Sequence, residues 1–109
     1  MKKSTKIDIP LNNIQGSTTT SSIYTFSASS GAFLIAEIII LWTNAAPKMI
    51  GVGTSTSGAP EVSANTNPSG NHLSTTFVCS MDTTLYVLAQ YSAAETAGKG
   101  YIRGLKFYP

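Results

Sequence analysis

One histidine and one cysteine are the residues of this sequence best suited to nucleophilic chemistry. His72 and Cys79 are seven positions apart in HLSTTFVCSM, where apolar and polar residues alternate as they do in a β-strand. An odd spacing on a strand places two side chains on opposite faces, so they cannot form a nucleophile and base pair. We interpret Cys79 as a small core residue and His72 as a polar residue at a loop edge.

The remaining residues show no catalytic or metal-binding pattern either. Among the five carboxylates, no near pair projects from one face as glycoside hydrolysis requires. The sequence has no Gly-rich phosphate loop with its lysine, no H-E-x-x-H and no nucleophile elbow. A single cysteine excludes an internal disulfide and a cysteine-rich zinc site. We therefore expect a protein that is not an enzyme and has no metal and no cofactor.

The composition predicts a single all-β domain. Ser and Thr make up 28 of the 109 residues, Gly and Pro another 14, and charged residues only 11%. Hydroxyl-bearing and β-branched side chains suit pleated, half-exposed strands, and Gly and Pro punctuate turns. A chain of this length can bury one core and is too short for two.

The charge distribution excludes a basic nucleic-acid groove. The net charge is +2, but Lys2, Lys3 and Lys6 supply three of the seven positive charges, and the rest of the chain sums to −1. Outside this N-terminal group only Arg103 and Lys106 lie close together, whereas phosphate binding needs clustered cations. We expect no nucleic-acid partner for this chain.

No segment is expected to insert into a membrane. FLIAEIIILW, residues 33–42, has about half of the roughly 20 residues that span a bilayer, and Glu37 sits in its middle. The MKK start is not followed by the apolar run of roughly 7 to 15 residues of a secretion signal, so we expect no export signal.

Alternating patterns between Gly, Pro, Asn and Ser turns predict seven or eight strands. Residues 54–71 are almost all small and polar and are expected to form a long surface loop. The final strand fits only with a bulge at Gly104, which would place Leu105 on the core side and Arg103 outward. Residues 1–16 are expected to be an arm or docking segment, and residues 17–109 an antiparallel β-sandwich or jelly roll. The expected strands cover 6–11, 23–28, 33–42, 48–54, a short piece near Val62, 72–81, 85–93 and 100–109.

Residues 33–42 are apolar on both faces, as are residues 85–91. The isoleucines favour a strand over a short buried helix. One face of such a strand covers the core, and the other would be an unusually large apolar patch on a monomer. We therefore predict a closed homo-oligomer, most simply a homotrimer. The interface residues that we expect are Leu34, Ile38, Ile40, Trp42, Tyr86 and Leu88.

Glu37 tests this reasoning, because an unpaired carboxylate on a dry face costs several kcal/mol. One interpretation places Glu37 at a wet rim beside Arg103 or Lys106. The other gives it a role at the oligomer axis, hydrogen-bonded or protonated there.

The order IYTFSASSGAFLIAEIIIL, a polar excursion, TTLYVLAQYSA and a closing GYIRGLKFYP resembles the trimeric jelly-roll domains at the ends of bacteriophage tail and head fibres. These domains are similar in architecture to tumour-necrosis-factor-like and complement-like heads. The resemblance covers residues 17–109, and what matches is strand order and patterning, including the terminal Phe107, Tyr108 and Pro109. It implies a fold of this kind, a trimer and a location in a virion, with Lys2, Lys3 and Lys6 of the N-terminal segment docked on another virion protein.

Three functions follow as hypotheses. The first is a non-enzymatic structural or attachment subunit of a phage virion, a fibre or head-fibre protein docked through its N-terminal arm. The second is a carbohydrate-binding module for a host-surface glycan, which would use the polar loop and the aromatic side chains. The third is a capsid or decoration protein. For a ligand we expect Asn65, Asn67, Asn71 and His72 to face outward; for a sugar platform the candidates are Trp42, Tyr86, Tyr91, Tyr101 and Tyr108, which we prefer to interpret as core and interface residues.

Overall fold

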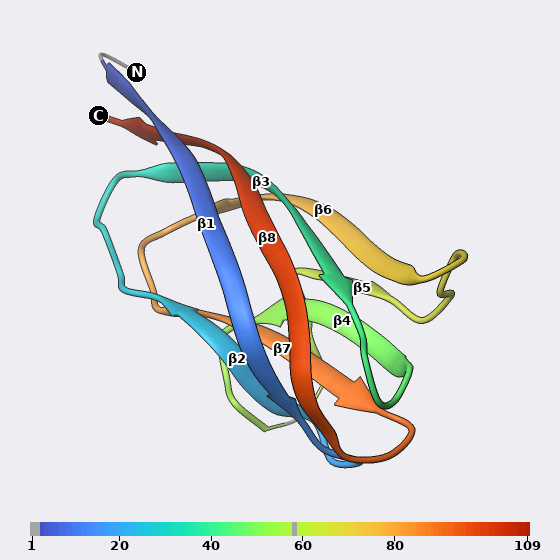
Figure 1. Cartoon of the computed structure of the whole chain (residues 1–109). Helices are drawn as coiled ribbons and strands as arrows, with labels where there is room; N and C mark the ends of the chain where they lie inside the picture. The colour runs from blue at the N-terminus through green and yellow to red at the C-terminus, as the bar shows by residue number, and fades with distance from the viewer. Residues whose placement is uncertain (1–2, 58) are drawn as a thin grey trace.

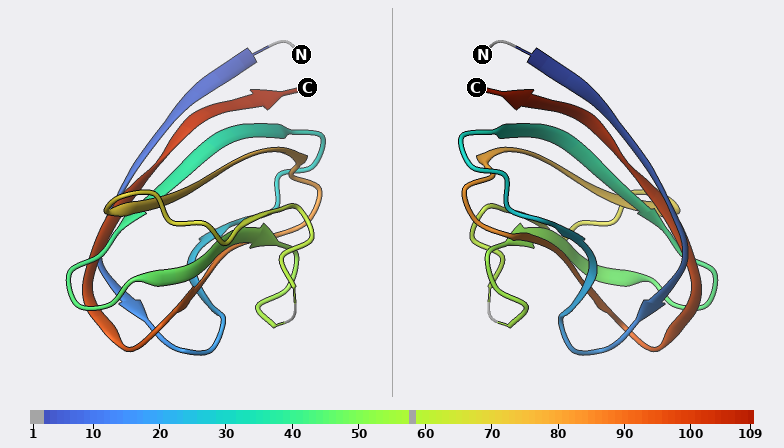
Figure 2. Two further views of the ribbon diagram at one scale, coloured as in Figure 1. Left: turned by 90° about the vertical axis from the view of Figure 1, so that its right-hand side faces the viewer. Right: turned by 90° about the vertical axis from the view of Figure 1, so that its left-hand side faces the viewer.

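Two antiparallel four-stranded sheets pack face to face in the computed structural model, which describes residues 3–57 and 59–109 (Figures 1 and 2). The long sheet has the order β1 (Lys3–Gly16), β8 (Glu95–Tyr108), β3 (Phe33–Leu41) and β6 (His72–Ser80). The short sheet has the order β2 (Ser21–Phe26), β7 (Leu85–Tyr91), β4 (Pro47–Gly53) and β5 (Ser63–Asn65). The chain crosses repeatedly from one sheet to the other, which is the jelly-roll arrangement. The prediction of an all-β sandwich or jelly roll with seven or eight strands is confirmed.

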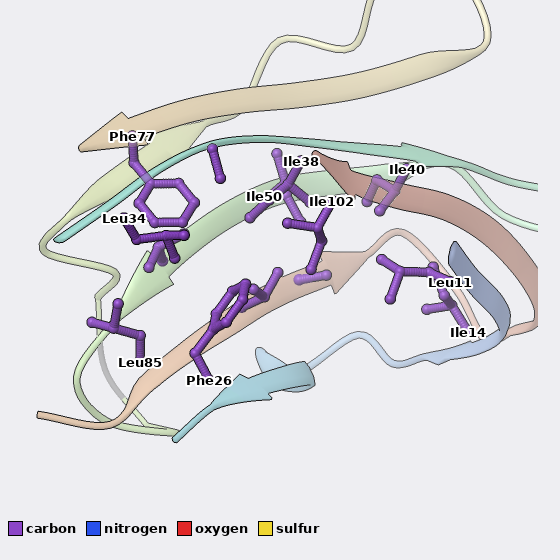
Figure 3. Close-up of a cluster of buried hydrophobic side chains, with 14 of the residues drawn as sticks. Leu11, Ile14, Phe26, Leu34, Ile38, Ile40, Ile50, Phe77, Leu85 and Ile102 are labelled. Atoms are coloured by element: carbon purple, nitrogen blue, oxygen red, sulfur yellow. The ribbon is translucent and has the colours of Figure 1, made fainter. Parts of the chain in front are cut away.

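The core lies between the sheets and takes one face from each strand. Along β3 the buried positions are Leu34, Ala36, Ile38 and Ile40, all 3% exposed or less. Figure 3 shows leucine and isoleucine side chains of β3 pointing toward Phe26, Ile50 and Leu85 of the short sheet. Each fully buried Leu or Ile contributes roughly 1.5 to 3 kcal/mol relative to exposure in water.

This core corrects the expected oligomer interface. Leu34, Ile38 and Ile40 are 0% exposed within a single protomer, so they have no surface left for a second copy. Strand alternation was read correctly, but the two faces of β3 were assigned the wrong way round. The one signal in the sequence was Glu37, because a carboxylate marks the face that water reaches and the other face carries no charge. The face that remains exposed carries Phe33, Ile35 and Leu41.

The chain covers the outer face of the short sheet with its own loop. Leu88 of β7 points away from the main core and is nevertheless 0% exposed. A Cβ built on Gly53 of β4 would lie 3.5 Å from Cδ1 of Leu88 and 3.2 Å from Cα of Pro60, so that the loop and Leu88 meet over this glycine. Leu88, expected at an oligomer interface, is therefore buried by its own protomer.

Residues 54–57 and 59–62 are held against the sheet rather than extended from it. The Val62 N–H donates to the Val52 carbonyl at 3.0 Å, and Thr54 Oγ1 donates to Glu61 Oε1 at 2.7 Å. Gly51 is essential to this contact, because a Cβ there would lie 2.6 Å from Cγ of Pro60. The prediction of a surface loop with a short strand near Val62 is confirmed in outline, since β5 begins at Ser63.

Side-chain hydrogen bonds close one lateral edge of the sandwich. Ser63 Oγ bonds to Thr75 Oγ1 and donates to the Thr76 carbonyl, and Asn65 Nδ2 donates to the Ser74 carbonyl at 2.7 Å. These bonds tie β5 of the short sheet to β6 of the long sheet. At the other lateral edge, hollows of about 310 and 330 Å³ lie along β1 and β2.

The N-terminal segment belongs to the sandwich. Residues 3–16 form β1, which pairs with β8 from Lys3 opposite Tyr108 down to Gly16 opposite Glu95. The expected boundary between an arm of residues 1–16 and a domain starting at residue 17 therefore does not separate two structural parts. Lys3 and Lys6 are exposed on this strand, and Lys2 lies outside the described residues.

Strand β8 has no bulge at Gly104, contrary to expectation. Gly104 pairs with Ala36 of β3 in a register that continues unbroken from Lys99 to Phe107. Leu105 is consequently on the outer face, 41% exposed, on the same side as Arg103. A Cβ at Gly104 would strike the carbonyl oxygen of Ile35 and lie 2.7 Å from Cα of Ala36. The glycine allows close approach of two backbones in a regular strand.

Replacing Gly104 with Ala should therefore disrupt the pairing of β8 with β3. We expect Gly104→Ala to lower the free energy of unfolding by about 3 kcal/mol or more, because backbone atoms cannot move aside as a side chain would. Gly53→Ala is the matched control, since its Cβ would lie no closer than 3.2 Å to any neighbouring atom. Urea unfolding followed by circular dichroism measures both; equal stability of the two variants would contradict the close approach.

Candidate functional site

The outer face of the long sheet carries the exposed apolar residues. Within residues 3–57 and 59–109, the large hydrophobic side chains that are exposed all lie on this one face. We call this set the outer patch: Phe33 (41% exposed), Ile35 (44%), Leu41 (36%), Val78 (64%) and Leu105 (41%). Phe33, Ile35, Val78 and Leu105 lie together at one end of this face, and Leu41 lies farther along β3.

Strand register places these residues side by side. Ile35 on the central strand β3 is opposite Leu105 of β8 and Val78 of β6, so three apolar side chains form one row across the sheet. Phe33 is opposite Phe107 in the row beyond it. Directly opposite side chains on neighbouring strands lie about 4.5 to 5.5 Å apart, close enough to touch.

A charged row crosses the same face beside the apolar one. Asp8, Arg103 and Glu37 are opposite one another on β1, β8 and β3. Arg103 Nε lies 3.4 Å from Asp8 Oδ1, and the guanidinium carbon lies 3.7 Å from the ring centre of Tyr101. Glu37 has no side-chain hydrogen bond or ion pair to any described residue. The register confirms Arg103 as the neighbour of Glu37, but it places Glu37 in the middle of the inner strand β3 rather than at a rim. Its role at an oligomer axis stays a prediction.

A hollow of about 550 Å³ opens in this face between the apolar and charged rows. Side chains of Ile35, Glu37, Val78 and Arg103 are among those that line it. Most of the exposed lining is apolar. The hollow therefore suits an apolar side chain with one charged neighbour better than it suits a polar small molecule.

Glu95 is the buried charge of the described chain, with 1% exposure. Its Oε1 accepts hydrogen bonds from the backbone N–H groups of Thr43 (2.6 Å), Asn44 (2.9 Å) and Ala45 (3.3 Å). Its Oε2 accepts from Thr96 at 2.9 Å and from Ala97 at 3.1 Å. The carboxylate joins the β3–β4 turn to the first residues of β8.

The hydrogen bonds decide the protonation state of Glu95. Burial raises the pKa of this carboxyl, but the backbone N–H groups of Thr43, Asn44, Ala97 and Ala45 outweigh burial and lower the pKa to about 2. The hydroxyl of nearby Tyr91 is buried and has no hydrogen-bond partner among the described residues, and burial together with the Glu95 charge raises its pKa to about 12. A carboxylate whose two oxygens both accept backbone hydrogen bonds, next to an un-ionised phenol, has a structural role rather than a role in proton transfer.

Sequence reasoning missed Glu95, because residues 93–100 read as a turn rather than the start of β8. The only signal was a carboxylate in a run of Ala, Thr and Gly, which gives no hint of partners 50 residues away. The role of Glu95 becomes visible only with the β3–β4 turn beside it, and that turn is about 50 residues away in the sequence.

The expected nucleophile and ligand residues are placed as follows. Cys79 faces inward, half-buried, and burial raises the pKa of its thiol, whereas His72 is at the other end of β6 and on the outer face. Asn65 is held by Ser74, and its Oδ1 accepts from the Asn67 N–H at 3.1 Å. Asn65 ends β5, Asn67 and Asn71 lie in the β5–β6 connection, and His72 begins β6. Their outward role as ligand residues remains a prediction.

The aromatic residues do not form one sugar platform. Tyr91 is in the core and 1% exposed. Tyr86 is on the outer face of the short sheet, whereas Tyr101 is on the outer face of the long sheet, on the opposite side of the molecule. Tyr108 is at the end of β8 near the amines of Lys3 and Lys106, and Trp42 is half-buried after β3.

The described residues form neither a metal-binding cluster nor a helix that could span a membrane. They contain no group of three or more His, Cys, Asp or Glu side chains arranged to hold a metal ion. No helix in the described ranges is long and apolar enough to cross a membrane.

The fold and the outer patch define a jelly-roll sandwich with one apolar outer sheet face. No protein-family model matches the sequence, and no curated protein matches it. Seven solved chains do match by structure. One of these structures is described as "Bacillus endospore appendages form a novel family of disulfide-linked pili"; it shares 19% identity, covers 97% of this chain and 87% of that chain, and has a TM-score of 0.55. At this identity the likeness shows a common fold.

The stability of the fold should depend on acid through Glu95. Because its pKa is about 2 in the folded protein and about 4.3 in an unfolded chain, its contribution is complete above about pH 5 and is lost as the pH falls toward 2. We expect Glu95→Gln to lower the melting temperature at pH 7 and to lose less further stability than the wild type on acidification. Thermal unfolding between pH 7 and pH 2 measures this.

Glu61→Gln is the control, since Glu61 is exposed and bonds only within the loop that begins at Thr54. We expect Glu61→Gln to lower the melting temperature at pH 7 by less than Glu95→Gln does, which distinguishes the buried carboxylate from an exposed one. Parallel pH profiles for wild type and Glu95→Gln would contradict the assignment.

Proposed function

We propose that this chain is a non-enzymatic structural subunit that assembles with other protein subunits, including further copies of itself, on the outside of a cell, spore or virus particle. The outer patch is the observation that carries the proposal. Five large apolar side chains on one sheet face have no cover within the described protomer. Burying such surface stabilises an association by roughly 25 cal/mol for each Å², and patches of this kind on soluble proteins mark interaction sites.

The comparison with a known fold agrees with an assembling subunit. The similar structure is described as a Bacillus endospore appendage that forms disulfide-linked pili. This chain has one cysteine, Cys79, which faces inward and whose thiol pKa is raised by burial. A thiol of this kind reacts poorly, so the contacts that we propose here are non-covalent.

The finer form of the proposal is the one that the sequence suggests: a homotrimer in a bacteriophage virion, as a fibre, head-fibre or decoration protein. A surface appendage is the alternative that the similar structure favours. Both are extracellular structural assemblies, and both need the same exposed sheet face. The mass and shape of the native assembly distinguish them.

Removing apolar side chains from the outer patch should abolish assembly without unfolding the protomer. We expect the wild type to have a mass that is a multiple of 11.5 kDa at micromolar concentration, and the double variant Ile35→Ser, Val78→Ser to have the mass of one chain. Light scattering coupled to gel filtration measures the mass, and circular dichroism confirms the fold.

Thr25→Ser, an exposed change on β2 away from the patch, is the matched control and should assemble as the wild type does. A wild-type protein that remains monomeric up to about 100 μM would contradict the proposed function, because dissociation constants above that range are weaker than structural assemblies require.

A further inference from the structure

We propose that a second copy of this chain docks on the outer patch about a two-fold axis that runs parallel to β3 and β8, between these two strands. In this arrangement Arg103 of each copy pairs with Glu37 of the other. The inference rests on the proposed function and adds to it the partner, the surface and the register.

The first step is the order of residues on the two central strands. Reading along the outer face, five pairs lie opposite one another on β8 and β3. The first two pairs are apolar, the third is charged, the fourth is mainly apolar, and the fifth joins a lysine to a leucine. In order, the pairs are Phe107 with Phe33, Leu105 with Ile35, Arg103 with Glu37, Tyr101 with Ile39, and Lys99 with Leu41.

The second step is the effect of symmetry on this pattern. Rotation about a two-fold axis that lies between two facing sheets and parallel to their strands moves residues across the sheet but not along the strands. Each row of residues in one copy therefore faces the same row in the other copy. The rotation sets β8 of one copy over β3 of the other, so Leu105 lies over Ile35 of the partner subunit and Arg103 lies over Glu37 of the partner subunit. A two-fold axis perpendicular to the strands and passing through the charged row would instead set Arg103 over itself, a like-charge contact that opposes association.

The third step is the state of the two charges in one protomer. The side-chain bond that the described residues give Arg103 is the long contact from Nε to Asp8, and both of those side chains are more than half exposed. Stacking on Tyr101 holds the guanidinium on this face. Glu37 is half-buried by its neighbours and has no partner among the described residues. Docking removes water from Glu37, and Arg103 of the partner subunit supplies the paired hydrogen bonds that a carboxylate then needs.

The fourth step is the shape of the face. The hollow of about 550 Å³ is centred on β3, between the Ile35 and Glu37 rows. The proposed axis brings Leu105 of the partner subunit and Arg103 of the partner subunit above this hollow. Facing sheets pack about 10 Å apart with interdigitated side chains, and a hollow on each face allows such packing.

Charge reversal tests this pairing directly. Glu37→Arg and Arg103→Glu each place like charges opposite one another in a dimer of identical chains, so each variant alone should weaken association by at least about 100-fold. In a mixture of the two, Arg103 of the first variant meets the unchanged Glu37 of the second, and the two reversed residues meet each other. The mixture should therefore associate within about tenfold of the wild type.

Sedimentation velocity of each variant, of their equimolar mixture and of the wild type measures the association, with circular dichroism to confirm the fold. Lys99→Glu on the same strand is the control, because the axis places Lys99 over the uncharged Leu41 of the partner subunit; it should associate as the wild type does. Variants that assemble normally alone, or a mixture that stays monomeric, overturn the pairing.

The mass of the wild type separates the two proposals. A dimer, or a larger even assembly built from dimers, supports both. A trimer supports the proposed function and overturns the two-fold pairing, as does an even assembly that is unaffected by either charge reversal. A monomer overturns both proposals together.

Discussion

The structure depends on the fact that β3 is apolar on both faces while a two-layer sandwich can bury only one of them. Leu34, Ile38 and Ile40 complete the core, and the alternate residues of the same strand then point outward. The core side is fixed by packing against the short sheet. The exposed side is the direct cost of that choice, since a strand cannot turn some of its residues without turning all of them.

The two sheets solve the same problem in different ways. The outer face of the short sheet is also partly apolar, but residues 59–62 fold back over it and Pro60 packs against Gly51. The long sheet has no loop of this kind among the described residues. The difference restricts the proposed association to one side of the molecule, because the outer face of the short sheet is covered within the protomer and that of the long sheet is open.

Sequence reasoning reached the strands and the fold class but not the inside and outside of the central strand. Alternation located β3, β6 and β7 nearly to the residue, because period-two patterns are local. The choice of face is largely a tertiary property, and the one local signal for it, Glu37 on the same face as Ile35, was outweighed by the apolar residues around it. Gly104 shows the same limit: a glycine in a strand suggested a bulge, whereas the close approach of Ile35 and Ala36 from a neighbouring strand explains it. Glu95 and its turn were out of reach for the same reason.

The pairing of Lys3 with Tyr108 brings the beginning and the end of the described chain to one pole of the sandwich, as Figure 1 shows. Any polypeptide joined before Lys3 and any joined after Pro109 would emerge together there, next to the rim of the long sheet. The opposite pole, with its loops, stays unobstructed. A fusion partner joined at either terminus would thus lie at the same pole of the sandwich. A short linker between the termini would also allow circular permutation, with new termini in another loop and the strands unchanged.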